Sequence, residues 1–196
     1  MLAMSSFEFL SVLISVVVGL GIANILNGVG RLIHRSGEVK VSATFVAWAL
    51  FLFLYMIVYW WTIVFGWRDW QSWNLLIFIF VLTYGVLLFL LSVILIPHDM
   101  PDDWDPHADF IRMRRWFFGV FIVLVVVEFT DSALKNHLDE FSLSYKLQMA
   151  FWLLGGIVCW ISENRRVQTV TAVLILLTHV SWVAYQLRDL EWSRGL

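Results

Sequence analysis

Long apolar runs separated by short polar connections make up almost the whole chain. A helix needs ~20 mainly apolar residues to cross the ~30 Å hydrocarbon core of a bilayer. Six runs meet this requirement, so the pattern predicts an all-α polytopic membrane bundle in a single domain, residues 1–196. The fifth run is the weakest, because Lys146 and Gln148 lie inside it. The predicted spans are approximately residues 7–29, 43–65, 74–96, 116–136, 143–162 and 167–187.

Basic residues are divided unequally between the connections on the two sides of the predicted bundle. Eight lie on one side of the predicted bundle and five on the other, and the richer side is expected to be cytoplasmic. Six spans then place both ends of the chain outside, N-out and C-out. The first run has Glu8 rather than a basic flank and is too long for a secretory signal, so we interpret it as a retained helix. The eight are Arg31, Arg35, Lys40, Arg112, Arg114, Arg115, Arg165 and Arg166, and the five are Arg68, Lys135, Lys146, Arg188 and Arg194.

Tryptophans gather near the predicted membrane boundaries. An indole ring favours this zone because its body is apolar and its single N–H seeks a polar partner. The pattern predicts an outer belt of Trp60, Trp61, Trp67, Trp70 and Trp73 and an inner belt of Trp48, Trp104 and Trp116.

Composition agrees with a membrane location. The chain is 61% hydrophobic and 14% charged, its mean hydropathy is +0.81, and such a surface does not suit water. The net charge is -2 and the 13 Lys and Arg residues are scattered, so the lipid bilayer is the expected partner and nucleic acid is not. Cys159 is the single cysteine, which excludes an intrachain disulfide. The sequence contains no HExxH, GxSxG or P-loop motif, so we predict neither an enzyme nor a cofactor.

The first predicted helix carries a small residue at every fourth position. Such a stripe lets another helix backbone approach closely. We interpret it as a packing seam within the chain, with a homo-oligomer interface as the alternative. The stripe consists of Ser11, Ser15, Gly19, Ala23 and Asn27.

Four ionisable residues fall inside or at the edge of predicted spans: Glu8, Glu128, Asp131 and His179. At 1.5 Å per residue, Glu128 and His179 each lie ~18 Å from the inner boundary. Charged groups at such depth usually face a bundle interior or a wet cavity, so these four predict a proton or cation path. The alternative is structural, with Asp131 paired to Lys135, Glu128 neutral and hydrogen-bonded, and His179 bonded to a carbonyl.

The third connection is rich in acids and histidines and superficially resembles a metal-binding tract. It lacks the glycine and the closing glutamate of an EF-hand loop, so His98, Asp103, Asp105 and His107 are weak metal candidates and no metal site is predicted. Asp105 followed by Pro106 is instead typical of a helix N-cap and first turn.

Two stretches carry a resemblance to a known group of proteins. The opening SSFEFLSVLISVVVGLGIANILNGVGRLIH and the RMRRWFFGV segment at the start of the fourth span resemble small bacterial membrane proteins with six transmembrane helices and no assigned function. The resemblance implies a location in the bacterial inner membrane and assigns no catalytic residue.

Two functions are consistent with the sequence. One is a small transporter or channel for protons or cations, in which the buried ionisable residues face a shared polar path. The other is a non-transporting sensor, effector or accessory subunit, in which these residues only hold helices together. The two differ in whether the acidic residues surround a cavity or are dry and fully paired.

Overall fold

Six α-helices follow the apolar runs of the sequence in a computed structural model of the protein. The structure describes residues 6–35, 37, 39, 41–68, 70, 72–100, 104–135 and 143–194. The all-α prediction is confirmed for these residues. The helices are α1 (Ser6–His34), α2 (Ala43–Gly66), α3 (Leu75–Leu95), α4 (Pro106–Leu134), α5 (Leu143–Ile161) and α6 (Arg165–Arg194).

Helices α1, α2, α3, α4 and α6 each have the length and the apolar composition needed to cross a bilayer. α5 has 19 residues, ~28 Å at 1.5 Å per residue, and Lys146 and Gln148 lie in its first two turns. The helices are thus compatible with an integral membrane protein, whereas a sixth crossing by α5 stays a prediction.

Helix α4 begins well before the predicted span, because a polar cap starts it in the third connection. The Asp105 carboxylate accepts hydrogen bonds from the backbone N–H groups of His107 (2.8 Å) and Ala108 (3.1 Å), and Pro106 occupies the first turn. The bonds from Ala108 and His107 hold the pKa of the Asp105 carboxyl below its usual value, since they favour the charged form. The predicted N-cap is confirmed.

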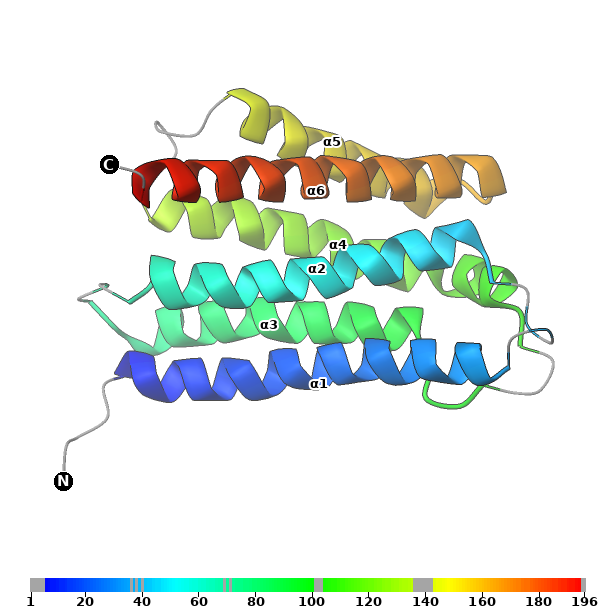
Figure 1. Ribbon diagram of the computed structural model, residues 1–196, viewed down its shortest axis with the longest axis horizontal. Helices are drawn as coiled ribbons and strands as arrows, with labels where there is room; N and C mark the ends of the chain where they lie inside the picture. Colours follow the sequence, from blue (N-terminus) through cyan, green and yellow to red (C-terminus); the bar gives the residue numbers. More distant parts are fainter. Residues whose placement is uncertain are drawn as a thin grey trace.

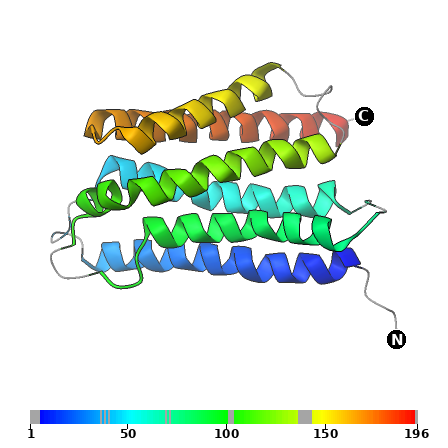
Figure 2. The same cartoon turned by 180° about the vertical axis from the view of Figure 1, so that it is seen from behind.

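The helices run antiparallel in sequence order, so α1 begins and α6 ends at the same end of the bundle (Figure 1). α2 is central and packs against α1, α3, α4 and α6. α1 lies on one flank of the bundle, and α5 and α6 lie on the opposite flank (Figure 2). A cavity bordered by α2 can therefore be reached by side chains from several helices.

Trp48 belongs to the buried core of the bundle. It is fully buried, and its ring meets those of Phe51, Phe117, Phe118 and Phe121 at centroid distances of 4.9–5.6 Å. The sequence pattern did not predict this burial, and the place of Trp48 in an interfacial belt stays a prediction.

Most of the small-residue stripe of α1 is exposed, although Ser15 Oγ accepts a hydrogen bond from Trp60 Nε1 of α2 at 2.9 Å. Ser15, Gly19, Ala23 and Asn27 are exposed, Ser11 is half-buried, and a Cβ added at Gly19 would meet nothing within 4 Å. The predicted internal seam is therefore wrong. Larger residues such as Leu10, Ile14 and Val18 form the buried face of α1 instead. Close approach occurs at Gly21, against Met56, and at Gly28, against Ile96. A role of the stripe between copies of the chain stays a prediction.

Candidate functional site

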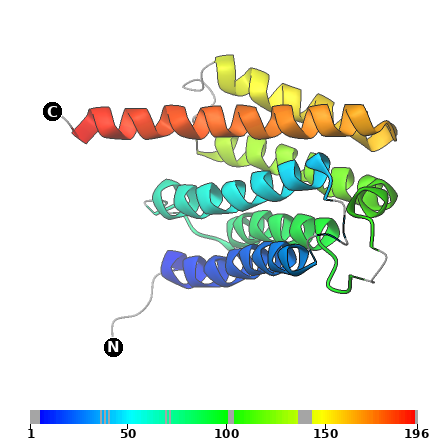
Figure 3. The same cartoon turned by 45° about the vertical axis from the view of Figure 1, so that its right-hand side comes forward.

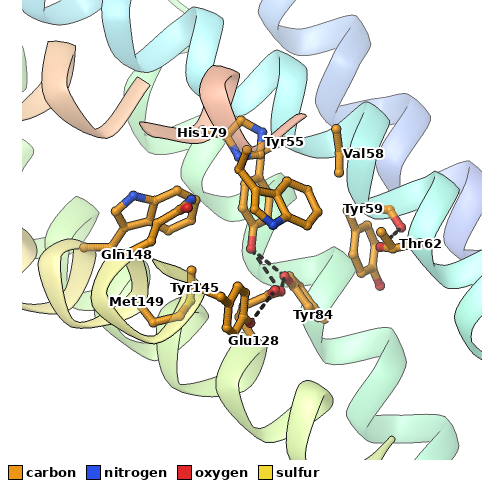
Figure 4. Close-up of a pocket in the computed structure, with 12 residues that line it drawn as sticks. Tyr55, Val58, Tyr59, Thr62, Tyr84, Glu128, Tyr145, Gln148, Met149 and His179 are labelled. Atoms are coloured by element: carbon orange, nitrogen blue, oxygen red, sulfur yellow. Dashed lines mark hydrogen bonds between the residues drawn. The ribbon is translucent and has the colours of Figure 1, made fainter. Parts of the chain in front are cut away.

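The carboxyl group of Glu128, in the second half of α4, is the meeting point of three tyrosines from three other helices (Figure 4). Tyr55 of α2 and Tyr84 of α3 donate to Oε2, the first at 3.1 Å, and Tyr145 of α5 donates to Oε1 at 3.1 Å. The hydroxyls of Tyr55 and Tyr84 are also 2.5 Å apart. A Ser132 hydroxyl lies 2.9 Å from that of Tyr145 and extends the network. The predicted alternative, a hydrogen-bonded Glu128, is confirmed.

A cavity of about 40 Å³ adjoins this network. A water molecule needs at least ~10–15 Å³ and two to four polar partners, so the space suits water or a small ion. The cavity draws its walls from five helices, α2 to α6. Its lining residues are Tyr55, Val58, Tyr59, Thr62, Tyr84, Glu128, Tyr145, Gln148, Met149, Trp152, His179 and Trp182.

The inclination of α5 makes room for the cavity. Gly155 lets α5 approach Thr171 of α6, and Gly156 lets it approach Phe121 of α4. α5 lies close to α6 at the end where the two are joined, and away from it at its own first residues (Figures 1 and 3). Gln148 of α5 and Trp182 of α6, both partly exposed, line the cavity in this wider part.

His179 of α6 lines the same cavity as Glu128, as their similar predicted depths suggested. It is 2% exposed, and its ring lies 5.1 Å from Tyr55, 5.7 Å from Trp152 and 6.3 Å from Trp182 between centroids. Its Nε2 atom has no hydrogen-bond partner among the described residues. A polar ring atom therefore lies against aromatic rings beside the cavity.

Asp131 belongs to a separate, closed arrangement at the end of α4. Its carboxylate pairs with Lys135 Nζ at 2.6 Å and accepts a hydrogen bond from Trp67 Nε1 at 2.9 Å. The Lys135 ammonium also lies 5.2 Å from the centre of the Trp67 ring. Asp131 and Trp67 are buried. The predicted Asp131 to Lys135 pair is confirmed, and Asp131 is not among the residues that line the cavity.

Glu8 does not join the cavity. It lies exposed in the first turn of α1, and α1 packs against α2 and α3. Of the four predicted path residues, the structure therefore brings Glu128 and His179 to one cavity, while Asp131 and Glu8 lie elsewhere.

The weak metal candidates of the third connection do not converge within the described part of the chain. Asp105 caps α4, and the backbone carbonyl of His98 accepts a hydrogen bond from Arg31. His107 is half-buried in the first turn of α4, and Asp103 lies outside the described residues. No group of three or more His, Cys, Asp or Glu side chains among the described residues is arranged to hold a metal ion.

The tyrosines are the site residues that sequence reasoning missed. A tyrosine in an apolar run reads as an interfacial or core residue, and nothing in its own neighbourhood identifies a distant carboxyl as its partner. One signal was present: Trp48, Phe51, Tyr55 and Tyr59 recur every three or four residues on α2, which places their side chains on one face. That face borders the cavity.

Comparison with known proteins adds no assignment to these residues. The chain matches none of the protein-family models, curated proteins or solved structures with which it was compared. The function proposed below therefore rests on the geometry around Glu128.

Proposed function

We propose that this chain is a small transporter or channel of the bacterial inner membrane that takes up and releases a proton or small cation at Glu128. The observation that carries the proposal is a single carboxyl group, in the second half of an apolar helix, that lines a cavity and is held by tyrosines from three other helices. Ionisable residues at membrane depth typically mark the paths of ions and protons.

The contrast with Asp131 supports this proposal. Asp131 has its charge balanced by Lys135 and its second oxygen bonded to Trp67. Among the described residues, the hydrogen-bond partners of Glu128 are all hydroxyl groups, and Glu128 faces the cavity. An acid that is paired with a lysine serves to hold helices together. An acid without such a partner can instead bind a proton or cation that comes and goes. We therefore assign exchange to Glu128 and a structural role to Asp131.

The proposal includes six membrane crossings with both ends outside. The antiparallel order brings the end of α1 and the starts of α4 and α6 to one end of the bundle (Figure 1). Arginines lie near this end of the bundle: Arg31 in the last turn of α1, Arg112 and Arg114 early in α4, and Arg165 at the start of α6. Basic residues are enriched on the cytoplasmic side, which supports this orientation.

Labelling of single cysteines from outside the cell is expected to establish the topology. Cys159 is buried, and in a Cys159→Ala background a membrane-impermeant maleimide should label Ser72→Cys in intact cells. Asp99→Cys and Asn164→Cys should react only after permeabilisation, because both lie in connections on the proposed inner side. Labelling of Asn164→Cys in intact cells would contradict a sixth crossing, since that position is outside if α5 does not cross.

Replacement of Glu128 by Gln is expected to abolish the ion movement. The amide keeps the shape of the side chain but can neither lose a proton nor balance a cation. The measurement uses the purified protein in liposomes that contain a pH-sensitive dye, with an imposed proton or cation gradient.

Glu8→Gln is the matched control, because Glu8 is an exposed acid outside the cavity. It should keep the flux of the unmodified protein. Both variants are compared after size-exclusion chromatography and circular dichroism have shown equal folding. Unchanged flux in a folded Glu128→Gln protein would overturn the proposal.

A second candidate is the non-transporting membrane module, favoured by the outward-facing small residues of α1. Gly19 leaves the helix surface open to another backbone, which is the usual basis of helix association in lipid. This function predicts loss of a partner complex, and no loss of flux, when Gly19 is replaced by Leu. Cross-linking in membranes together with the liposome assay distinguishes the two candidates.

A further inference from the structure

We propose that the cavity beside Glu128 is a binding site for a small ammonium cation, such as methylammonium, which replaces the proton of the Glu128 carboxyl. This inference rests on the proposed function and narrows it to one class of ion. It follows from the lining of the cavity, from the number of protons in the hydrogen-bond network and from the size of the space.

Aromatic rings make up half of the cavity wall. Glu128 is the one carboxylate in the described lining, and neither Lys nor Arg is part of it. Ring faces attract cations, most strongly ammonium groups that have shed their water, while a carboxylate supplies the countercharge. Hard divalent cations such as Ca²⁺ are usually held by several carboxylate and carbonyl oxygens, and the described lining offers a single carboxylate. The six aromatic residues are Tyr55, Tyr59, Tyr84, Tyr145, Trp152 and Trp182.

The hydrogen bonds around Glu128 have room for one more proton than the hydroxyls supply. The Tyr55 hydroxyl, the Tyr84 hydroxyl and Oε2 of Glu128 form a triangle with three contacts. Each contact between two oxygen atoms needs one proton, and the two hydroxyls hold two. When Glu128 is ionised, both hydroxyls donate to Oε2 and the contact between them holds no proton. When Glu128 is neutral, its O–H group donates to one hydroxyl, which in turn donates to the other, so the carboxyl proton is the third and the triangle is complete.

Loss of this proton has two consequences. Two oxygens are left in contact with no hydrogen between them, and the Glu128 carboxylate carries a negative charge inside the bundle. An ammonium group corrects both, because it brings a positive charge and several N–H donors to the same oxygens. The step is a balanced exchange: the carboxyl O–H bond breaks, the proton leaves to water, and the carboxylate forms an ion pair with the incoming cation. One proton is released for each cation bound.

The size of the cavity restricts the cation. A space of about 40 Å³ is several times the minimum that a water molecule needs, so it admits a small cation such as an ammonium or methylammonium ion. A short alkyl chain can extend toward Gln148 of α5 and Trp182 of α6, which are partly exposed members of the lining. Bulky quaternary ions are expected to be excluded.

Other titratable groups border Glu128 and set the conditions of the experiment. His179 lines the same cavity, so a proton on its ring would repel the ammonium ion, and binding should weaken in acid for this reason as well as through Glu128. Besides Glu128, the titratable groups that line the cavity are Tyr55 and Tyr59 from α2, Tyr84 from α3, Tyr145 from α5 and His179 from α6. Asp131 of α4 and Lys135, the residue after α4, lie outside the lining but act on Glu128 through their charges.

Proton release is the measurement that tests this inference. Methylammonium chloride is added to the detergent-purified protein in a weakly buffered solution near neutral pH, and a pH indicator follows the release. Because ligand and proton compete for one group, a saturable release is expected, as it is for metal sites whose ligands deprotonate on binding. Methanol, which has nearly the same shape and no charge, and equal concentrations of NaCl and KCl serve as controls and should release no protons.

Four variants test whether the proton release arises in the cavity. Glu128→Gln should lose it entirely. Trp182→Leu removes an aromatic face from the wall and should weaken the apparent affinity for methylammonium about tenfold, whereas Trp182→Phe keeps a ring and should change the affinity far less. Trp160→Leu, at an exposed position elsewhere on α5, should leave it unchanged.

The outcomes separate this inference from the proposed function. If Na⁺ or K⁺ releases as many protons as methylammonium does, the assignment to ammonium ions is overturned, while cation exchange at Glu128 stands. Absence of release with every cation, together with Glu128-dependent proton flux in liposomes, overturns the inference and leaves the proposed function. Release by methylammonium that persists in folded Glu128→Gln places the exchange elsewhere and overturns the assignment of the site.

Discussion

Replacing Lys135 with Met is expected to destabilise the protein by about 3–5 kcal/mol, the usual cost of removing one partner of a buried ion pair. The variant leaves the Asp131 carboxylate buried with a single donor, the Trp67 indole N–H at 2.9 Å. The free energy of unfolding can be measured by circular dichroism as the fraction of SDS in mixed micelles is raised.

Two variants make this result specific. Lys146→Met is a matched change at an exposed position of α5 and should shift the free energy of unfolding by no more than ~0.5 kcal/mol. The double variant Lys135→Met with Asp131→Asn should recover much of the loss, because it removes the unpaired charge. A Lys135→Met protein as stable as the unmodified chain would show that the pair contributes nothing.

Trp48→Ala is expected to reduce the free energy of unfolding by about 3 kcal/mol, the low end of the range for truncation of a buried tryptophan. The low end applies because lipid tails solvate apolar side chains, so the loss comes from packing alone. Trp48 is fully buried and touches four phenylalanine rings on α2 and α4, which cannot close the space without moving their helices. The same SDS titration measures the effect.

Trp116→Ala is the control for Trp48→Ala. Both tryptophans were predicted to lie in one interfacial belt, yet Trp116 is 70% exposed on α4. Its replacement should change the free energy of unfolding by ~0.5 kcal/mol or less. Equal losses for the two variants would contradict the core position of Trp48.

The helices were predictable because their signal is local. A run of ~20 apolar residues is visible without any knowledge of its neighbours, and a polar cap such as Asp105 is visible in four residues. The buried face of each helix was not predictable in the same way. Lipid and core are both apolar, so the outward Gly19 and the inward Gly21 look equally suited to a packing seam.

The site was half predictable for a related reason. Glu128 stands out from an apolar run because an acid is costly there, and its depth predicted that it would share a region with His179. Asp131 lies only one turn away but turns toward Lys135 and Trp67, a difference that depends on the end of α2. Tyr55, Tyr84 and Tyr145 carry no such cost in an apolar run, and only the packing of four helices brings their hydroxyls to one carboxyl.

The cavity wall is assembled from five consecutive helices, and this has a consequence for biogenesis. When the chain enters the membrane in order, Glu128 arrives with α4, and its last hydroxyl partner arrives with α5. His179 and Trp182 close the wall only with α6. A chain that stops after α5 thus carries the acid and its tyrosines beside an open flank, so the proposed ligand binding requires α6 to be in place.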